Sequence, residues 1–123
     1  MKNIAIAEFA ACYVAVWNEP DPAVRDAAVA ALWSADAQAY TSANEYRGRH
    51  AVGERVAASY EKFVAGQGFI FRAARPAEAH HDGARIHWEM TPAAGGEAVS
   101  GGVQFLLLDT EGQIRFDYQF IDY

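Results

Sequence analysis

The C-terminal residues 101–122, GGVQFLLLDTEGQIRFDYQFID, constrain the fold more than any other part of the chain. Two β-prone runs, residues 101–108 and 113–121, lie on either side of the sequence Asp109-Thr110-Glu111-Gly112. In that sequence Asp opens a type I turn, and Gly can adopt a positive φ where the turn closes. Two such runs joined by such a turn predict an antiparallel hairpin.

Both faces of the predicted hairpin are apolar. Because strand side chains alternate between the two faces of a sheet, Phe105 and Leu107 point to one face while Leu106 and Leu108 point to the other. One face must therefore be covered by helices from earlier in the chain. The other face must meet a second sheet or a second subunit.

Composition narrows the class of protein. With 123 residues, of which 52% are hydrophobic, the chain predicts one globular domain over residues 1–123. The net charge of -6 disfavours nucleic acid and an anionic membrane surface as partners, because both favour clustered Lys and Arg. No stretch approaches the roughly 18 apolar residues that span a bilayer. We therefore expect a soluble, cytoplasmic protein, and we expect no cofactor.

Three helices are predicted before the C-terminal strands. Apolar residues at three- and four-residue spacing indicate a first helix around residues 9–17, with Cys12 on its buried face. A second helix begins after Asp21-Pro22, an N-cap followed by proline at the first helical position. Val24 is expected on the inward face of that helix. A third helix covers residues 50–64.

Strands fill most of the remaining sequence. A short strand is predicted at residues 38–42, and extended segments at residues 69–75, 77–80 and 84–90 precede the hairpin. Helices followed by a run of antiparallel strands indicate an α+β architecture. The sheet must curve over the helices to bury so many aromatic residues, which leaves a cavity between the two layers.

Several local sequences are similar to those of one known superfamily. They comprise residues 13–22 (YVAVWNEPDP), 32–37 (LWSADA), 47–49 (RGR), 80–83 (HHDG) leading to 88–89 (WE), and 109–114 with 120–122. Together with the order of elements, they resemble the nuclear transport factor 2-like superfamily, in particular its SnoaL-like polyketide cyclase branch. The resemblance implies a cystatin-like α+β cone, in which three N-terminal helices pack on a strongly curved antiparallel sheet.

The resemblance implies an apolar pocket but no single activity. The superfamily includes polyketide cyclases, ketosteroid isomerases, limonene-type epoxide hydrolases, dehydratases and non-catalytic binding modules. Its enzymes use carboxylates whose pKa is raised by burial. Where relatives carry such acids, this chain has Ser42, Gln104 and Gln119, and an amide cannot take a proton at neutral pH. Glu89 and Asp117 are the acids that remain, and alternation does not fix which face each occupies.

The candidate site residues follow from these arguments. Glu89 and Asp117 are the predicted acid–base residues, with Tyr40 or Tyr13 as hydrogen-bond donor. The residues predicted to line a ligand cavity are Tyr13, Trp17, Tyr40, Ser42, Tyr60, Phe63, Trp88, Gln104 and Gln119. The aromatic residues among them could equally belong to the core. The two glutamines could bond each other and the backbone, because a buried amide without partners costs about 1–3 kcal/mol.

Charged residues leave one further alternative open. Glu89 shares a strand face with Arg85 and His87, so this row is either solvated or forms a base in the cavity tuned by its neighbours. No metal site is predicted, because the four histidines do not converge as zinc ligands must.

We expect the protein to bind a hydrophobic small molecule. One alternative is an isomerase, polyketide-cyclase-like or limonene-type epoxide-hydrolase-like enzyme that uses acid–base chemistry in the same cavity, and another is a non-catalytic dimeric accessory domain. An ionisable carboxylate in an open cavity would favour an enzyme. We also expect a homodimer through the sheet, because Phe116, Tyr118 and Phe120 give the last strand an apolar face opposite to the one that closes the cavity.

Overall fold

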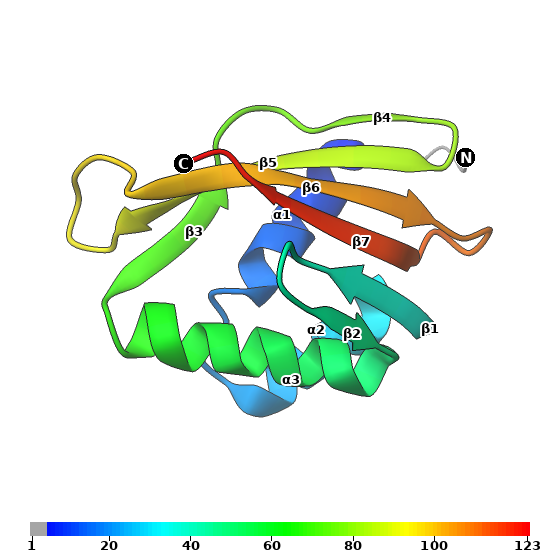
Figure 1. Cartoon of the computed structure of the whole chain (residues 1–123), viewed down its shortest axis with the longest axis horizontal. Helices are drawn as coiled ribbons and strands as arrows, with labels where there is room; N and C mark the ends of the chain where they lie inside the picture. Colours follow the sequence, from blue (N-terminus) through cyan, green and yellow to red (C-terminus); the bar gives the residue numbers. More distant parts are fainter. Residues whose placement is uncertain (1–4) are drawn as a thin grey trace.

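The structure is a computed structural model that describes residues 5–123, and it places three helices against one curved, mixed sheet (Figure 1). The elements are α1 (Ile6–Val16), α2 (Pro22–Leu32), β1 (Trp33–Tyr40), β2 (Glu45–Arg47), α3 (Arg49–Ser59) continued by the π-helix η1 (Tyr60–Ala65), β3 (Phe69–Ala73), β4 (Glu78–His80), β5 (Gly83–Pro92), β6 (Ser100–Leu108) and β7 (Ile114–Ile121). This architecture is the predicted cystatin-like α+β cone.

The sheet is built around the predicted C-terminal hairpin. Its strand order is β2-β1-β7-β6-β5-β3, with β4 paired to β5. Strands β6 and β7 pair antiparallel, with Gln104 directly opposite Gln119. The prediction of a wholly antiparallel sheet is wrong at one pair, because β1 runs parallel to β7. The chain leaves β1 through β2 and α3 and returns to its side only in the last strand, so no hairpin fixes the direction of this pair.

The end of α1 is tied to the sheet by an asparagine. The Asn18 side chain donates to the carbonyl of Phe71 in β3 at 2.7 Å and accepts from the Phe71 amide at 2.8 Å. These two hydrogen bonds take the place of those that a neighbouring strand would make to the Phe71 backbone at the sheet edge. They also fix the distance between α1 and β3. Cys12 of α1 is exposed, so the expectation that it is buried is wrong.

Helix α2 begins as predicted, but Val24 does not face inward as expected. The Asp21 carboxylate caps it by accepting from the amide of Ala23 at 2.9 Å. Val24 is 50% exposed, whereas Arg25 is buried with Val29 and Leu32. The Arg25 guanidinium donates to the carbonyl oxygen of Glu19 at 2.8 Å and lies over the ring of Tyr60, while its Nε is buried without a hydrogen-bond partner among the described residues.

The aromatic core lies where α1 meets β1. Trp33 is fully buried, and its ring centre lies 5.4 Å from that of Tyr13 and 6.3 Å from that of Trp17. On strand β6, next to β5, Gly102 has no room for a side chain, because a β-carbon there would clash with the carbonyl oxygen of Phe120 and come within 3.0 Å of the Trp88 ring. No helix within residues 5–123 has the length and apolar character needed to cross a membrane.

Candidate functional site

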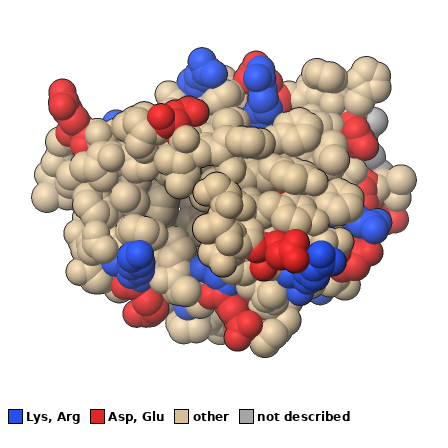
Figure 2. Space-filling model, viewed as in Figure 1, with Lys and Arg blue, Asp and Glu red and all other residues tan. Residues whose placement is uncertain are grey.

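A cavity of about 800 Å³ lies between the helices and the sheet. Its walls come from α1, α3 with η1, the loop of residues 41–44, and the inner faces of β5, β6 and β7. Figure 2 shows that the surface is hollowed on this face and that mainly uncharged side chains surround the hollow. Its apolar wall includes Trp17, Phe63, Phe71 and Met90.

Most of the residues predicted to line a ligand cavity do so. Those in the wall are Tyr13, Trp17, Ser42, Phe63, Trp88, Gln104 and Gln119. Tyr60 does not line it, contrary to the prediction, because its ring lies 5.0 Å beneath the buried Arg25 guanidinium instead.

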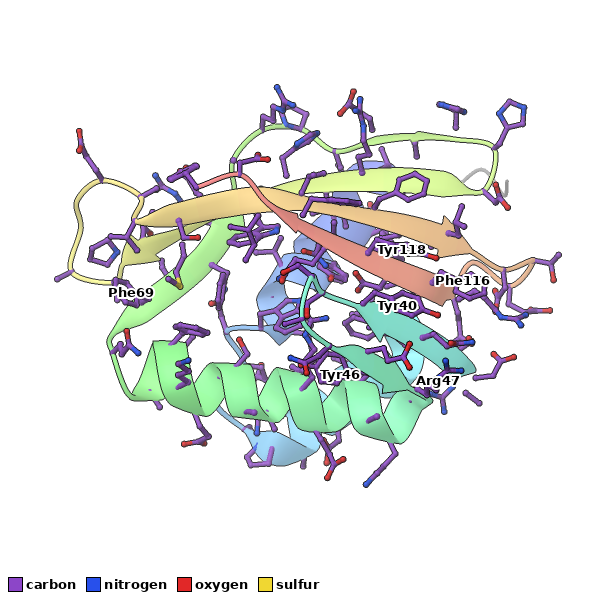
Figure 3. The ribbon with its side chains drawn as sticks, viewed as in Figure 1. Tyr40, Tyr46, Arg47, Phe69, Phe116 and Tyr118 are labelled. Atoms are coloured by element: carbon purple, nitrogen blue, oxygen red, sulfur yellow. The ribbon has the colours of Figure 1, made fainter. Side chains whose placement is uncertain are left out.

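Tyr40 also lies outside the cavity, contrary to the prediction. It is on the outer face of β1, where its ring stacks on Tyr118 at 4.8 Å (Figure 3). Its hydroxyl donates to Gln38 Oε1 at 2.7 Å. Ala37 and Ala39 take the inward positions of this strand, so alternation turns Tyr40 away from the site.

Glu89 is placed on the outer face of β5, so it is not a cavity base. Its neighbours Trp88 and Met90 line the cavity, and alternation sends the carboxylate of Glu89 to the opposite side. There it accepts from Arg72 Nε at 2.6 Å. Arg85 and His87 share this outer face, and both contact Glu78 of β4 at 2.7 Å. The charged row is therefore an outer ion-pair network.

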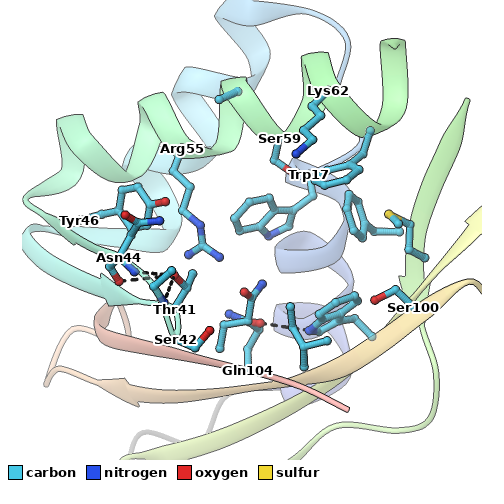
Figure 4. A pocket seen from close by; sticks show the side chains of 18 of the residues that line it. Trp17, Thr41, Ser42, Asn44, Tyr46, Arg55, Ser59, Lys62, Ser100 and Gln104 are labelled. Carbon is cyan, nitrogen blue, oxygen red and sulfur yellow. Dashed lines mark hydrogen bonds between the residues drawn. The ribbon is translucent and has the colours of Figure 1, made fainter. Parts of the chain in front are cut away.

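Asp117 is the acid that faces the interior. It is fully buried in β7, where its Oδ2 accepts from the Tyr13 hydroxyl at 2.8 Å and its Oδ1 accepts from Gln104 Nε2 at 2.7 Å. Gln104 Oε1 in turn accepts from Trp88 Nε1 at 3.0 Å (Figure 4). The two glutamines thus do not bond each other: Gln104 belongs to this network, while Gln119 faces the cavity.

The carboxylate of Asp117 does not itself line the cavity. It lies behind Tyr13 and Gln104, which do. Any influence of Asp117 on a bound molecule must therefore pass through the Tyr13 hydroxyl or the Gln104 amide.

Burial changes the protonation behaviour of this pair. Loss of solvent raises the pKa of Asp117, against the opposing effects of the Arg55 charge and of the hydrogen bonds from Tyr13 and Gln104. Burial, and then the nearby Asp117 charge, raise the pKa of Tyr13 well above its usual value. Tyr13 is therefore neutral and keeps its proton for hydrogen bonding, and Asp117 is more readily protonated than a surface carboxyl.

Arg55 is the site residue that sequence reasoning missed. Its guanidinium projects from α3 into the cavity (Figure 4), 5.1 Å from the ring centre of Trp17 and 5.2 Å from that of Tyr46. Helical spacing in the sequence could have identified Arg55 as a cavity residue. Arg55 lies four residues before Ser59 and eight before Phe63, both in the cavity wall, and residues at such spacing share a helix face.

Neither a family model nor a curated protein matches the chain. Solved structures do. A proposed isomerase of the SnoaL-like family from Agrobacterium tumefaciens is 26% identical, with 96% of this chain and 97% of that chain covered and a TM-score of 0.86. A proposed polyketide cyclase from Sinorhizobium meliloti is 11% identical, covering 98% of this chain and 100% of that chain, with a TM-score of 0.71.

A third similar structure is a protein of unknown function with a cystatin-like fold from Methylobium petroleophilum. It is 18% identical, with 100% of this chain and 79% of that chain covered and a TM-score of 0.72. Three helices packed on a curved mixed sheet, together with this likeness, define a cystatin-like α+β cone protein. These likenesses fit a place for the chain in the nuclear transport factor 2-like superfamily.

The raised pKa of Asp117 predicts how stability depends on pH. In the folded state the pKa lies above the ordinary value of 3.8, so the folded protein holds this proton more tightly than the unfolded chain. That contribution to stability is complete below the unfolded pKa and is lost as pH rises through the folded pKa. The free energy of unfolding of the wild type minus that of Asp117→Asn should therefore fall as pH rises from about 4 to about 8.

Urea denaturation of both proteins across this range measures the difference. Contributions from the other titratable groups cancel between the two proteins. A difference that grows with pH would mean that the native state favours the ionised carboxylate.

Proposed function

We propose that this protein binds a hydrophobic small molecule that carries a polar oxygen, inside the cavity between helices and sheet. The observation that supports this proposal is the pairing of an aromatic wall with the buried network from Trp88 through Gln104 and Asp117 to Tyr13. The cavity volume of about 800 Å³ is within the usual range for small-molecule sites. Burial of apolar ligand surface there contributes about 25 cal/mol per Å².

The network gives the cavity a selective polar wall. Tyr13 and Gln104 are held by Asp117, so neither side chain can rotate freely to suit any ligand. Groups fixed in this way favour one ligand orientation, because the ordering has already taken place in the folded protein. We place the polar oxygen of the ligand at this wall and its apolar body against Trp17 and Phe63.

Filling part of the cavity should weaken binding. Ser59 lines the cavity, so Ser59→Phe should weaken the binding of 2-naphthamide, a neutral aromatic amide, by about 10-fold or more because the new ring occupies ligand space. Isothermal titration calorimetry measures the affinity. Ala65→Phe adds the same ring at an exposed position of η1 outside the cavity and is the matched control. Equal affinity of both variants for 2-naphthamide would mean that this probe binds outside the cavity.

A second candidate function is an isomerase- or cyclase-type enzyme, and the Tyr13–Asp117 pair favours it. When Asp117 is protonated, its carboxyl group can donate a hydrogen bond to the Tyr13 oxygen. The Tyr13 hydroxyl is then free to donate to a ligand oxygen. Such a donor stabilises an enolate-like oxygen in a desolvated site. The likenesses to a proposed isomerase and a proposed polyketide cyclase agree with this chemistry. Epoxide-hydrolase-type chemistry is less favoured, because the buried Asp117 cannot contact a water molecule in the cavity.

Enolisation offers a direct test of the second candidate. The wild type should accelerate deuterium incorporation into 2-tetralone, an apolar enolisable ketone, above the rate in buffer, with water as the base. Tyr13→Phe should lose about 10- to 100-fold of that acceleration because it lacks the oxygen donor. Nuclear magnetic resonance follows the exchange. A wild-type exchange rate equal to that in buffer would contradict the enzyme candidate, and only the binding function would stand.

We also propose a homodimer through the outer face of the sheet. Phe105 and Tyr118 are cross-strand partners there, each 37% exposed, and Phe120 is 56% exposed. An apolar face of this kind is stabilised when a second copy covers it. A cytoplasmic location and the exclusion of nucleic acid remain predictions from composition.

The dimer proposal is tested by adding charge to this face. Phe120→Glu should convert the protein to a monomer, because the interface would have to bury two unpaired carboxylates. Light scattering coupled to size exclusion measures the mass, and Ala65→Phe should remain dimeric. A wild type that is monomeric at micromolar concentration would contradict the proposal.

A further inference from the structure

Arg55 is a cation without a partner inside the cavity. No carboxylate in the described part of the chain forms an ion pair with it. Asp117 is close enough to Arg55 for the two charges to interact. Both carboxylate oxygens of Asp117, however, already accept hydrogen bonds from Tyr13 and Gln104. The guanidinium is held in place by the rings of Trp17 and Tyr46 rather than by an anion.

The charges around the cavity have the opposite sign to the protein as a whole. The chain carries a net charge of -6, yet Arg55 and Lys62 both line the cavity. Glu54 is the acidic residue in the lining, and its side chain is 71% exposed and within 3.8 Å of His50 Nε2. Its charge is therefore directed toward solvent. Asp117 lies behind Tyr13 and Gln104 and does not line the cavity, so the charged groups that reach the cavity interior are cationic, which favours an anion.

Donors other than Arg55 face the same space. Figure 4 shows the guanidinium directed toward Gln104, with Ser42 and Thr41 from the 41–44 loop nearby. A guanidinium presents a planar fork that matches a carboxylate with two parallel hydrogen bonds, and aromatic rings on its faces leave the fork edge free.

We propose, on the basis of the binding function above, that the ligand is an apolar organic acid whose carboxylate is bound by Arg55. The apolar body lies against Trp17 and Phe63. The carboxylate lies between the Arg55 fork and the polar wall at Gln104, beside the 41–44 loop. Lys62 is an exposed point charge over Phe63 and contributes attraction at the cavity mouth rather than recognition.

A matched pair of probes tests this proposal. The probes are 2-naphthoate, an anion at neutral pH, and 2-naphthamide, its neutral counterpart of nearly the same shape. The wild type should bind the naphthoate about 10-fold more tightly than the naphthamide. Arg55→Gln should weaken naphthoate binding about 10- to 100-fold and change naphthamide binding less than about 3-fold, because only the charged fork is lost. Calorimetry at pH 7 gives both affinities.

Two further variants separate charge from geometry. Arg55→Lys keeps the charge without the fork and should give an intermediate naphthoate affinity. Lys62→Gln removes a lining charge outside the proposed contact and should change naphthoate binding less than about 3-fold. Retained naphthamide binding shows that each variant is folded.

The outcomes distinguish this proposal from the one it rests on. Equal affinity of the wild type for both probes, or equal loss of both in Arg55→Gln, would overturn carboxylate recognition and leave the binding function intact. If the wild type binds neither probe, both the binding function and this inference fail.

Discussion

The structure depends on one carboxylate removed from water. An ionisable group as fully buried as Asp117 is tolerated only when neighbouring donors compensate the lost solvation. Tyr13 supplies one donor from α1, and Gln104 supplies the other from β6. Because hydrogen bonds are short and directional, the Tyr13 contact fixes the rotation of α1 relative to the sheet, while the Gln104 contact joins the neighbouring strands β6 and β7. The helix layer and the sheet layer are thereby held in one register around a polar centre.

The same centre determines the character of the cavity. Tyr13 and Gln104, held by Asp117, form a fixed polar part of a wall that is apolar over most of its area. Arg55 adds a positive charge opposite that polar wall, supported by two aromatic rings. The proposed ligand, an apolar organic acid, is complementary to these surfaces: its apolar body matches the apolar wall and its carboxylate matches Arg55. No part of the site is assembled from a single element, since α1, α3, β5, β6 and β7 each contribute.

Much of this arrangement was predictable from local pattern, and some of it was not. Alternation correctly separated Asp117 and Gln119 from Tyr118, and helical spacing placed Phe63 at the cavity. Alternation could not decide whether Glu89 or its neighbour Trp88 faces inward, because both faces of β5 are partly buried. The direction of Tyr40 depended on the pairing of β1 with β7, which no turn in the sequence specifies.

The sequence by itself determined the elements and their order. Turn residues and the period of apolar side chains are local properties, so the hairpin, the three helices and the α+β class follow from neighbours in the chain. Tertiary structure alone decided which polar groups meet. Tyr13 and Asp117 are 104 residues apart, and their contact exists because α1 crosses the inner face of a curved sheet at β7. Local periodicity gives each element a face, but only the packing of all elements determines what that face meets.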